Sequence, residues 1–481
     1  MCKGHAGGCC SSLHRRDFMS VMGLSALAAN SSLLASASAA AADAISPAGK
    51  PRIRVVFFRP KVDRYWMGWP GACYDIKARE SEYVKIMSDA AKELGIQLDV
   101  DVEPVTDMPG VSSLLEQCKQ SPPDGIVITV GSLSPNYWPQ ANHFVAEKGE
   151  LPAIIFSPMG TSFTDHLQAM RKAKRTLVAA TQDLLWLATG MRMFRTIWDM
   201  KNTRICIVNG NKTEDRVLAG LGTTLRFVPL QRWVEELKKI EVNDEVRTAA
   251  EYFTSRAQKV VEPKQDDILN AAKNYVVARR IMAAEDCQGI SLNCLGLVES
   301  RQIPCPPCMA WQRLNDEELV GCCECDLTAA ISLRLCSLLC RRPGFMQDPA
   351  PNTVSNTFMG AHCTSATKLY GFDKPAVPQL LRSHSESEIG VSPQVLWPVG
   401  EIVTVMKFMD PTKMILGTGK ILANINTPPA GGCRTSLELA LDNVADTLDC
   451  QGFHQLFIVG KHDLLFKAYG KLAGIEVAPI A

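Results

Sequence analysis

The chain has 481 residues, of which 46% are hydrophobic and 21% are charged, and its formal net charge at pH 7 is +1. This composition is typical of a globular protein and excludes a strongly basic nucleic-acid-binding surface or an acidic tail. We therefore expect small molecules and further copies of the chain as partners, and no nucleic acid.

Residues 1–44 have the order of a signal peptide. The pair Arg15-Arg16 precedes a mildly apolar stretch at residues 21–34, and small residues follow at 35–40. This order indicates export, and the arginine pair indicates the twin-arginine route; a frayed N-terminal helix is the alternative. The apolar stretch is too short to span a bilayer. The predicted location is the periplasm or cell envelope, with no stable membrane span.

The mature chain is long enough for two or three domains. Strand and helix patterns alternate through its first half, which is typical of parallel sheets covered by helices on both faces. The expected strands are residues 54–58, 98–105, 125–130, 152–156, 204–208 and 224–230. The expected helices are residues 81–94, 111–120, 136–147, 182–200 and 231–240.

The last third is richer in strand patterns, at residues 401–409, 413–422, 433–441 and 455–459, and ends in a helix at 463–473. The predicted fold class is α/β: two Rossmann-like, doubly wound parallel-sheet domains and a mixed α/β C-terminal domain with a β-rich part. The predicted domains after the signal peptide are 45–176, 177–318 and 319–481.

Cysteine is unusually frequent, and ten of the 18 cysteines fall between Cys287 and Cys363. Seven of them form a local pattern: Cys305-x-x-Cys308, Cys322-Cys323-x-Cys325, Cys336 and Cys340. The spacing permits a zinc or iron–sulfur framework. The last two cysteines lie in an apolar helical repeat, where they fit as small buried hydrophobic residues. Buried free thiols are therefore the alternative to a metal–thiolate site.

Glu324 and Asp326 directly precede the apolar helix that is expected from Leu327. The positive end of a helix dipole favours ionised carboxylates, which suit a metal ligand or a base. The alternative is that Asp326 only caps the helix, since Asp is a preferred N-cap. Four of the six histidines of the mature chain lie after residue 360: His362, His384, His454 and His462.

Two segments resemble the L-fucose isomerase and L-arabinose isomerase superfamily. Residues 314–330 resemble the fucose isomerase segment in which an acid pair precedes a helix, here Glu324 and Asp326. Residues 452–460 resemble the family's strand with a metal-ligand histidine, here His454. Further matches extend the resemblance over most of the mature chain: Phe58-Arg59-Pro60, residues 204–210 and residues 472–477.

The resemblance implies three α/β domains, the last being isomerase-like, and a Mn²⁺-type aldose–ketose isomerase ancestry. It places metal ligands at Asp326 and His454 and, by similarity to arabinose isomerases, at His362. It makes Asp326 and Glu324 the catalytic acids. The family's other catalytic glutamate is expected near residues 306–308, where this chain has no acid. Family sites are built between subunits, so a homo-oligomer is also implied.

Three further residues are candidates for binding substrate. His384 lies in a polar loop, and Arg434 stands among small residues, where it can meet a carboxylate or sulfate. For both, a solvated loop or a structural ion pair is the alternative. Arg59, after the first expected strand, is the third candidate.

The leading hypothesis is a metal-dependent aldose–ketose isomerase, or a close relative, that acts on a carbohydrate outside the cytoplasm with a divalent ion, Mn²⁺. Two alternatives stay open. One is a non-catalytic exported sugar-binding protein of the same fold. The other is a metal–thiolate protein, with zinc or an iron–sulfur cluster, built on the cysteines between Cys305 and Cys325.

Overall fold

The computed structural model describes residues 49–66, 73–133 and 135–481. The predicted signal peptide, with Arg15 and Arg16, lies outside the described residues. Within the described part of the chain, every helix is too short or too polar to cross a membrane.

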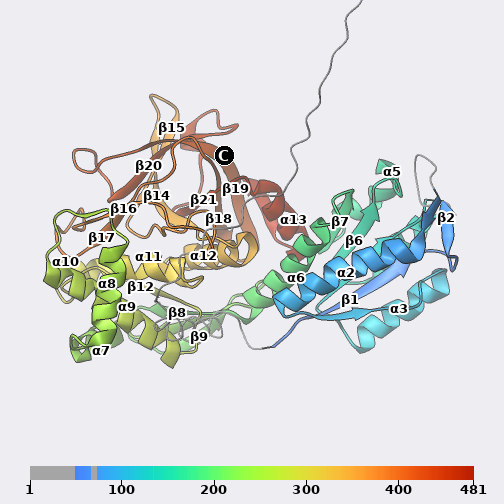
Figure 1. Cartoon of the computed structure of the whole chain (residues 1–481), viewed down its shortest axis with the longest axis horizontal. Helices are drawn as coiled ribbons and strands as arrows, with labels where there is room; N and C mark the ends of the chain where they lie inside the picture. The colour runs from blue at the N-terminus through green and yellow to red at the C-terminus, as the bar shows by residue number, and fades with distance from the viewer. Residues whose placement is uncertain (1–48, 67–72, 134) are drawn as a thin grey trace, which may run out of the picture. The chain divides into compact units, whose positions relative to one another are not determined.

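The first domain is built on five parallel strands in the order β4-β1-β5-β6-β7 (Figure 1). Its main elements are β1 (Arg52–Phe58), α2 (Ile76–Leu94), β4 (Gln97–Val100), α3 (Met108–Gln120), β5 (Gly125–Val130), α4 (Trp138–Glu147), β6 (Ala153–Pro158), β7 (Thr176–Thr181) and α6 (Trp186–Asn202). Successive residues of a strand point to opposite faces. Val55 therefore packs with α2 and α6, and Val56 packs with α3 and α4. Smaller elements are β2 (Arg64–Trp66), β3 (Cys73–Asp75), α5 (Thr164–Leu167) and η1 (Ala169–Lys172).

The second domain has a five-stranded sheet in the order β13-β12-β8-β10-β9, parallel except for β9. Its strands are β8 (Arg204–Val208), β9 (Glu214–Val217), β10 (Thr224–Val228), β12 (Gly289–Leu292) and β13 (Val320–Cys323). Its helices are α7 (Leu230–Lys239), α8 (Asp244–Ser255), α9 (Gln265–Ala284), α10 (Cys294–Glu299) and α11 (Cys308–Asp316). The central strands β8 and β12 and the edge strand β13 are largely buried, as expected for a sheet that is covered by helices, whereas the edge strand β9 is charged and exposed.

The C-terminal part is a closed antiparallel barrel of six strands. They follow the order β18-β21-β14-β15-β20-β19, and β19 pairs back with β18. The barrel elements are β14 (Phe345–Asn352), β15 (Thr357–His362), β18 (Ile402–Asp410), β19 (Lys413–Asn424), β20 (Thr435–Leu441) and β21 (Gln455–Val459). After η2 (Thr447–Asp449), β21 and α13 (Asp463–Ala473), the last strand β22 (Glu476–Pro479) runs parallel to β19. A separate three-stranded sheet contains β11 (Lys259–Val260), β16 (Gln379–Arg382) and β17 (Ser392–Val395).

The helix α12 (Leu327–Cys340) connects the second sheet to the barrel. It contacts α6, β12 and β13 as well as the barrel strands β14, β18 and β21. Just before it, Glu324 and Cys325 have left-handed backbone conformations with φ of 58° and 56°. Non-glycine residues keep such conformations only where the surrounding structure holds them, and they cluster at functional sites. The turn between β13 and α12 is therefore a strained point of the fold.

The structure confirms the predicted fold class in its coarser form, a mixed α/β protein with two parallel sheets of Rossmann-like alternation. The predicted β-rich C-terminal part is, more specifically, the six-stranded barrel. The domain limits differ from the predicted ones at residues 176 and 318. β7 begins at Thr176 and pairs with β6, and β13 pairs with β12. The two sheets thus extend to Thr181 and Cys323.

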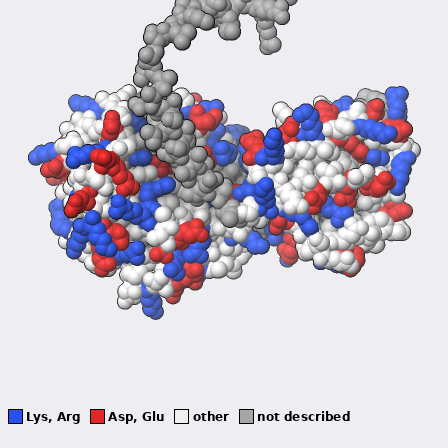
Figure 2. Space-filling model, turned by 60° about the horizontal axis from the view of Figure 1, so that its bottom comes forward, with Lys and Arg blue, Asp and Glu red and all other residues white. Residues whose placement is uncertain are grey.

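Acidic and basic side chains are interspersed over the face of the molecule that Figure 2 shows. This mixing agrees with a formal net charge of +1. A surface that attracts a polyanion needs an extended field of one sign. Interspersed charges on this face do not create such a field.

Candidate metal centre

Three neighbouring barrel strands bring three polar side chains together. Asp348 lies on β14, His362 ends β15, and His454 directly precedes β21. Because β14 pairs with both β15 and β21, these residues become neighbours although they lie far apart in sequence. One nitrogen or oxygen atom of each residue lies within 4.8 Å of the others. The turn before α12 adds Glu324 and Asp326 from the second domain.

His454 is the centre of this cluster and is only 2% exposed. Its Nδ1 lies 3.0 Å from Oδ2 of Asp326. Its Nε2 lies 2.9 Å from Oδ1 of Asp348 and 3.5 Å from Oε2 of Glu324. The two ring nitrogens therefore face different carboxylates. His454 also has a left-handed backbone, with φ of 54°.

Asp326 is saturated with hydrogen bonds. Its Oδ1 accepts from the Ala329 N–H and the Thr328 hydroxyl, at 2.8 Å each. Its Oδ2 accepts from Lys407 Nζ at 2.7 Å and faces His454. Burial opposes ionisation of Asp326, but the His454 hydrogen bond and the Lys407 charge hold the pKa of its carboxyl well below the usual range. Asp326 therefore caps α12, as the alternative reading of the sequence had it, and also holds His454.

An ionised Asp326 fixes the tautomer of His454. The Nδ1–H of the ring donates to Asp326, so Nε2 is the nitrogen that faces Asp348 and Glu324 and that can bind an ion once it loses its proton. Carboxylates that orient a histidine in this way are typical of the surroundings of metal ligands. Burial disfavours a charged ring, but the Asp326 hydrogen bond and the negative charges of Asp348 and Glu324 raise the pKa of His454 to about 9.

Three atoms that face this point are buried and lack a hydrogen-bond partner: Asp348 Oδ1, His362 Nε2 and His454 Nε2. Although Asp348 Oδ1 and His454 Nε2 are 2.9 Å apart, their contact is not a hydrogen bond. Each unsatisfied buried polar group costs about 1–3 kcal/mol. A single cation at this point would satisfy all three atoms at once. The residues present therefore fit a metal ion.

His362 stands beside the other two ligand candidates, with its ring centroid 5.5 Å from that of His454. Its Nε2 lies 3.8 Å from Oε1 of Glu324, and its Nδ1 accepts the Cys363 N–H at 2.8 Å. A neutral ring that accepts at Nδ1 carries its proton on Nε2. Binding of an ion at Nε2 therefore requires the other tautomer, with the proton on Nδ1, beside the Cys363 thiol at 3.6 Å.

Glu324 differs from Asp326 in its surroundings. Its side chain is 27% exposed and faces Nε2 of both histidines, at 3.5 and 3.8 Å. Burial raises the pKa of the Glu324 carboxyl. A carboxyl group that is partly exposed and readily gains and loses a proton suits acid–base chemistry.

The sequence-based hypothesis overlooked Asp348 and Lys407. Asp348 is followed by Pro349-Ala-Pro351, which reads as irregular chain because proline is rare in strands. The pairing of β14 with β21 ends at Gln347, before both prolines. Both are tolerated there because no hydrogen bond to β21 needs the N–H that proline lacks. Lys407 lies within β18. A lysine in a strand is usually exposed, so the sequence does not reveal that Lys407 is only 5% exposed.

The structure does not bring the three predicted substrate-binding residues into this cluster. Arg434 donates to the Ser383 carbonyl and hydroxyl and to the Thr427 carbonyl, so it ties two loops together. His384 lies near Cys308 and Cys363. Arg59 forms a two-point ion pair with Glu80 in the first domain.

The cysteines between Cys305 and Cys325 converge only in part: Cys308 and Cys323 both contact Cys363, whereas the other three thiols point elsewhere. The Cys305 thiol lies against the Pro306 carbonyl, at 3.3 Å, and accepts the Val391 N–H. The Cys322 thiol lies 3.6 Å from Met346 Sδ, and the Cys325 thiol faces the Val208 carbonyl. The two sequence motifs therefore do not form one framework from all five cysteines, although one cysteine of each motif lies beside Cys363.

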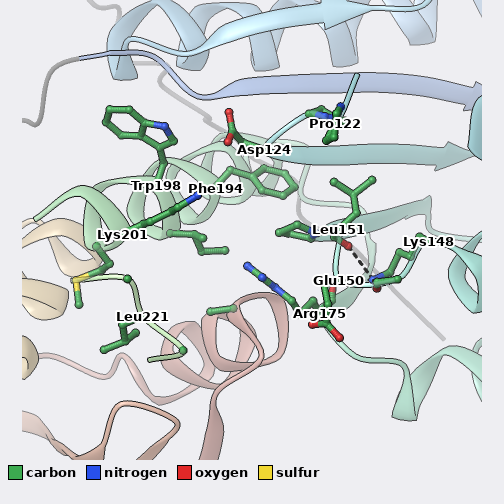
Figure 3. A pocket seen from close by; sticks show the side chains of 18 of the residues that line it. Pro122, Asp124, Lys148, Glu150, Leu151, Arg175, Phe194, Trp198, Lys201 and Leu221 are labelled. Atoms are coloured by element: carbon green, nitrogen blue, oxygen red, sulfur yellow. Dashed lines mark hydrogen bonds between the residues drawn. The ribbon is translucent and has the colours of Figure 1, made fainter. Parts of the chain in front are cut away.

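A cavity of about 850 Å³ lies elsewhere, lined by the first domain, the loop Val217–Gly222 and α13. Figure 3 shows Arg175 and Lys148 at its wall, where Lys148 donates to the Leu151 carbonyl. The cavity lies at the ends where β5, β6 and β7 begin, and it shares no lining residue with the metal centre.

No protein-family model matches this chain, and no curated protein matches its sequence. The resemblance to sugar isomerases therefore stays a hypothesis, and the geometry above is the main basis for a function.

Proposed function

We propose that the protein is a divalent-metal-dependent aldose–ketose isomerase, or a close relative, that acts on a carbohydrate. One observation carries the proposal: Asp348, His362 and His454 converge from three adjacent strands, with buried ligand atoms that lack partners. The resemblance of residues 314–330 and 452–460 to sugar isomerases supports it, since Glu324 and His454 meet in this cluster.

Asp348, His362 and His454 would hold the ion. One carboxylate and two imidazoles suit first-row divalent ions, and we propose Mn²⁺. When bound, this ion would hold two neighbouring substrate oxygens and stabilise negative charge that develops on them. Asp326 keeps the His454 lone pair directed at the ion, and Lys407 keeps Asp326 charged.

Glu324 is the proposed base. Isomerisation moves a proton from one carbon of the substrate to its neighbour, and a carboxylate beside both carbons can take the proton and return it. Glu324 is the partly exposed acid of the cluster, and it stands on a turn opposite the ligands. Asp348 supplies the second acid that residues 306–308 lack. The cluster thus has separate carboxylates for metal binding, proton transfer and histidine orientation.

Metal content and proton exchange together test this proposal. The purified full chain is stripped with a chelator, reloaded with Mn²⁺ and incubated with a panel of aldoses in D₂O. NMR then follows loss of the substrate C–H signal next to the carbonyl. Wild type should bind Mn²⁺ and catalyse exchange. Asp348→Asn and His454→Ala should lose both, whereas Glu324→Gln should keep Mn²⁺ and lose exchange.

His462→Ala is the matched control. His462 lies just past β21, where its Nε2 donates to the Val459 carbonyl at 3.1 Å, so this variant should retain Mn²⁺. Wild type that binds Mn²⁺ but exchanges no proton with any sugar would favour the non-catalytic sugar-binding protein. Wild type that binds no divalent ion contradicts both functions.

We also propose a homo-oligomer in which another subunit completes the site. The support is the position of Arg59, which belongs to the first domain and is not among the residues of the metal centre. Sedimentation of wild type at micromolar concentration tests this, and a monomer that is fully active would contradict it.

A further inference from the structure

A group of thiols surrounds Cys363, next to the metal centre in the chain. The Sγ atoms of Cys308 and Cys363 are 3.1 Å apart, and both residues are buried. One ring nitrogen of His384 lies within 4.8 Å of both sulfurs. Cys433 also lies within 4.8 Å of Cys363. Cys363 is therefore the shared member of two close groups: Cys308 and His384 lie on one side of its sulfur, and Cys433, together with His362, on the other. Cys323 also contacts the Cys363 thiol.

These four residues come from four separate parts of the fold. Cys308 begins α11, Cys363 follows β15, His384 follows β16, and Cys433 precedes β20. The Arg434 side chain links the loops that carry two of them. It donates to the carbonyl and hydroxyl of Ser383, the neighbour of His384, while its own neighbour is Cys433. The loops of Cys433 and His384 are thus fastened to each other.

Packing alone does not account for this arrangement. A buried apolar core would place hydrocarbon side chains here, and a thiol is only a weak hydrogen-bond donor. Instead, sulfur faces sulfur and imidazole faces sulfur. Ser387 holds the Nδ1 atom of His384: its backbone N–H lies 3.3 Å from Nδ1 and its hydroxyl 2.9 Å from it. Binding of an ion at the other ring nitrogen requires the tautomer with the proton on Nδ1, which the Ser387 hydroxyl can accept.

We propose that Cys308, Cys363, Cys433 and His384 form a second metal site, which binds Zn²⁺. Three thiolates and one imidazole are a common tetrahedral ligand set for structural zinc. Protein side chains fill all four positions, so the site has no open position for a substrate. It shares no residue with Asp348, His362 and His454, and its soft sulfur ligands select a different ion from that centre.

The role of this zinc is structural. It joins α11 of the second domain to the loops beside β15, β16 and β20. Binding of a structural zinc contributes directly to folding free energy, because the site does not exist in the unfolded chain. Cys363 also donates its N–H to His362, so a zinc ion bound to the Cys363 thiolate would fix the backbone beside His362.

Zinc content and cobalt spectroscopy of the full chain test the proposal. Wild type should carry about one Zn²⁺ per chain by elemental analysis. Replacement by Co²⁺ should produce a thiolate-to-cobalt charge-transfer band and the intense visible bands of tetrahedral Co²⁺. Cys308→Ser and Cys433→Ser should reduce zinc to near zero and remove the charge-transfer band. Cys433 is half-buried, so its variant is the one expected to stay folded.

Cys450→Ser and His454→Ala are the controls. Cys450 lies outside the thiol group, and His454 belongs to the other centre, so both variants should keep zinc and the cobalt spectrum. Non-reducing peptide mapping that finds a Cys308–Cys363 disulfide in the native protein would overturn the proposal. Wild type without zinc and without a cobalt–thiolate band would also overturn it, whatever the outcome for Mn²⁺.

Discussion

Asp326 and His454 are 128 residues apart in the sequence, yet Oδ2 of Asp326 lies 3.0 Å from Nδ1 of His454. The same carboxyl caps α12 and pairs with Lys407. One side chain thus fixes the start of a central helix and the orientation of a histidine, while His454 and Lys407 keep its carboxyl ionised.

Asp326→Asn should weaken Mn²⁺ binding by about 10- to 100-fold, because loss of an orienting partner usually has an effect of this size. Asparagine is as good an N-cap as aspartate, so α12 should keep its start. Calorimetric titration with Mn²⁺ measures the affinity. The matched control is Asp107→Asn, since Asp107 caps α3 through the Gly110 N–H at 2.8 Å and lies outside the metal centre. Equal Mn²⁺ affinity in wild type and Asp326→Asn would contradict the orienting role.

Lys407→Met should destabilise the protein by about 3–5 kcal/mol, because removal of one partner leaves a buried charge uncompensated. The Lys407 and Asp326 side chains are only 6% and 17% exposed. Urea unfolding, followed by tryptophan fluorescence, measures the change. Lys413→Met on the adjacent strand is the control: its ion pair with Glu476 is exposed, so its loss should cost less than about 1 kcal/mol. Equal losses in the two variants would rule out a special role for the buried pair.

Lys148 should make stability rise with pH above neutrality. Burial, helped by the nearby Arg175 charge, lowers the pKa of Lys148 from 10.5 to about 8. Between these values the unfolded chain binds more protons than the folded chain, so stability increases as the pH rises through this window. Below about pH 8 this lysine is protonated in both states and contributes no slope.

The test compares urea unfolding of wild type and Lys148→Met across this range of pH. Because cysteine and tyrosine groups titrate in the same range, the informative quantity is the difference between the two proteins. The free energy of unfolding of wild type, minus that of Lys148→Met, should increase between about pH 8 and pH 10.5. Parallel curves would show that Lys148 is not responsible.

Replacing Arg15 and Arg16 together by lysine should trap a full-length precursor in the cytoplasm, since the arginine pair defines the export route. Immunoblots of cytoplasmic and exported fractions measure precursor and mature protein. Normal processing and export of the double variant would show that the localisation hypothesis is wrong.

Local patterns predicted the elements well and their assembly poorly. The strand at Gln455–Val459 and the helices at Leu327–Cys340 and Asp463–Ala473 have the limits that hydrophobic spacing indicated. Closure of the barrel was not predictable, because it depends on pairings such as Phe345 with Phe457 between distant segments. Spacing gives no information about such contacts.

The same limit applies to the metal centre. Glu324, His362 and His454, which family similarity marked, lie together. Asp326, which it marked as a metal ligand, caps α12 and bonds to His454 instead. Asp348 was missed because the two prolines after it are untypical of a strand, so the segment was not recognised as one. Lys407 was missed because its partner, Asp326, lies 81 residues away. The cysteines in contact are likewise distant in the sequence: Cys308 and Cys363 are 55 residues apart, and Cys294 and Cys323 are 29 residues apart.

Closure of the barrel also sets the timing of biogenesis. The pairing of β14 with β21 requires residues up to 459, so the barrel and the metal centre can form only when nearly the whole chain has left the ribosome. The first residues to emerge are those of the predicted export signal. If the protein is exported in the folded state, the signal peptide is synthesised first but can be used only after almost all of the chain has been made. Long-range strand pairing is slow, so folding of the last quarter of the chain would decide when a molecule is ready for export.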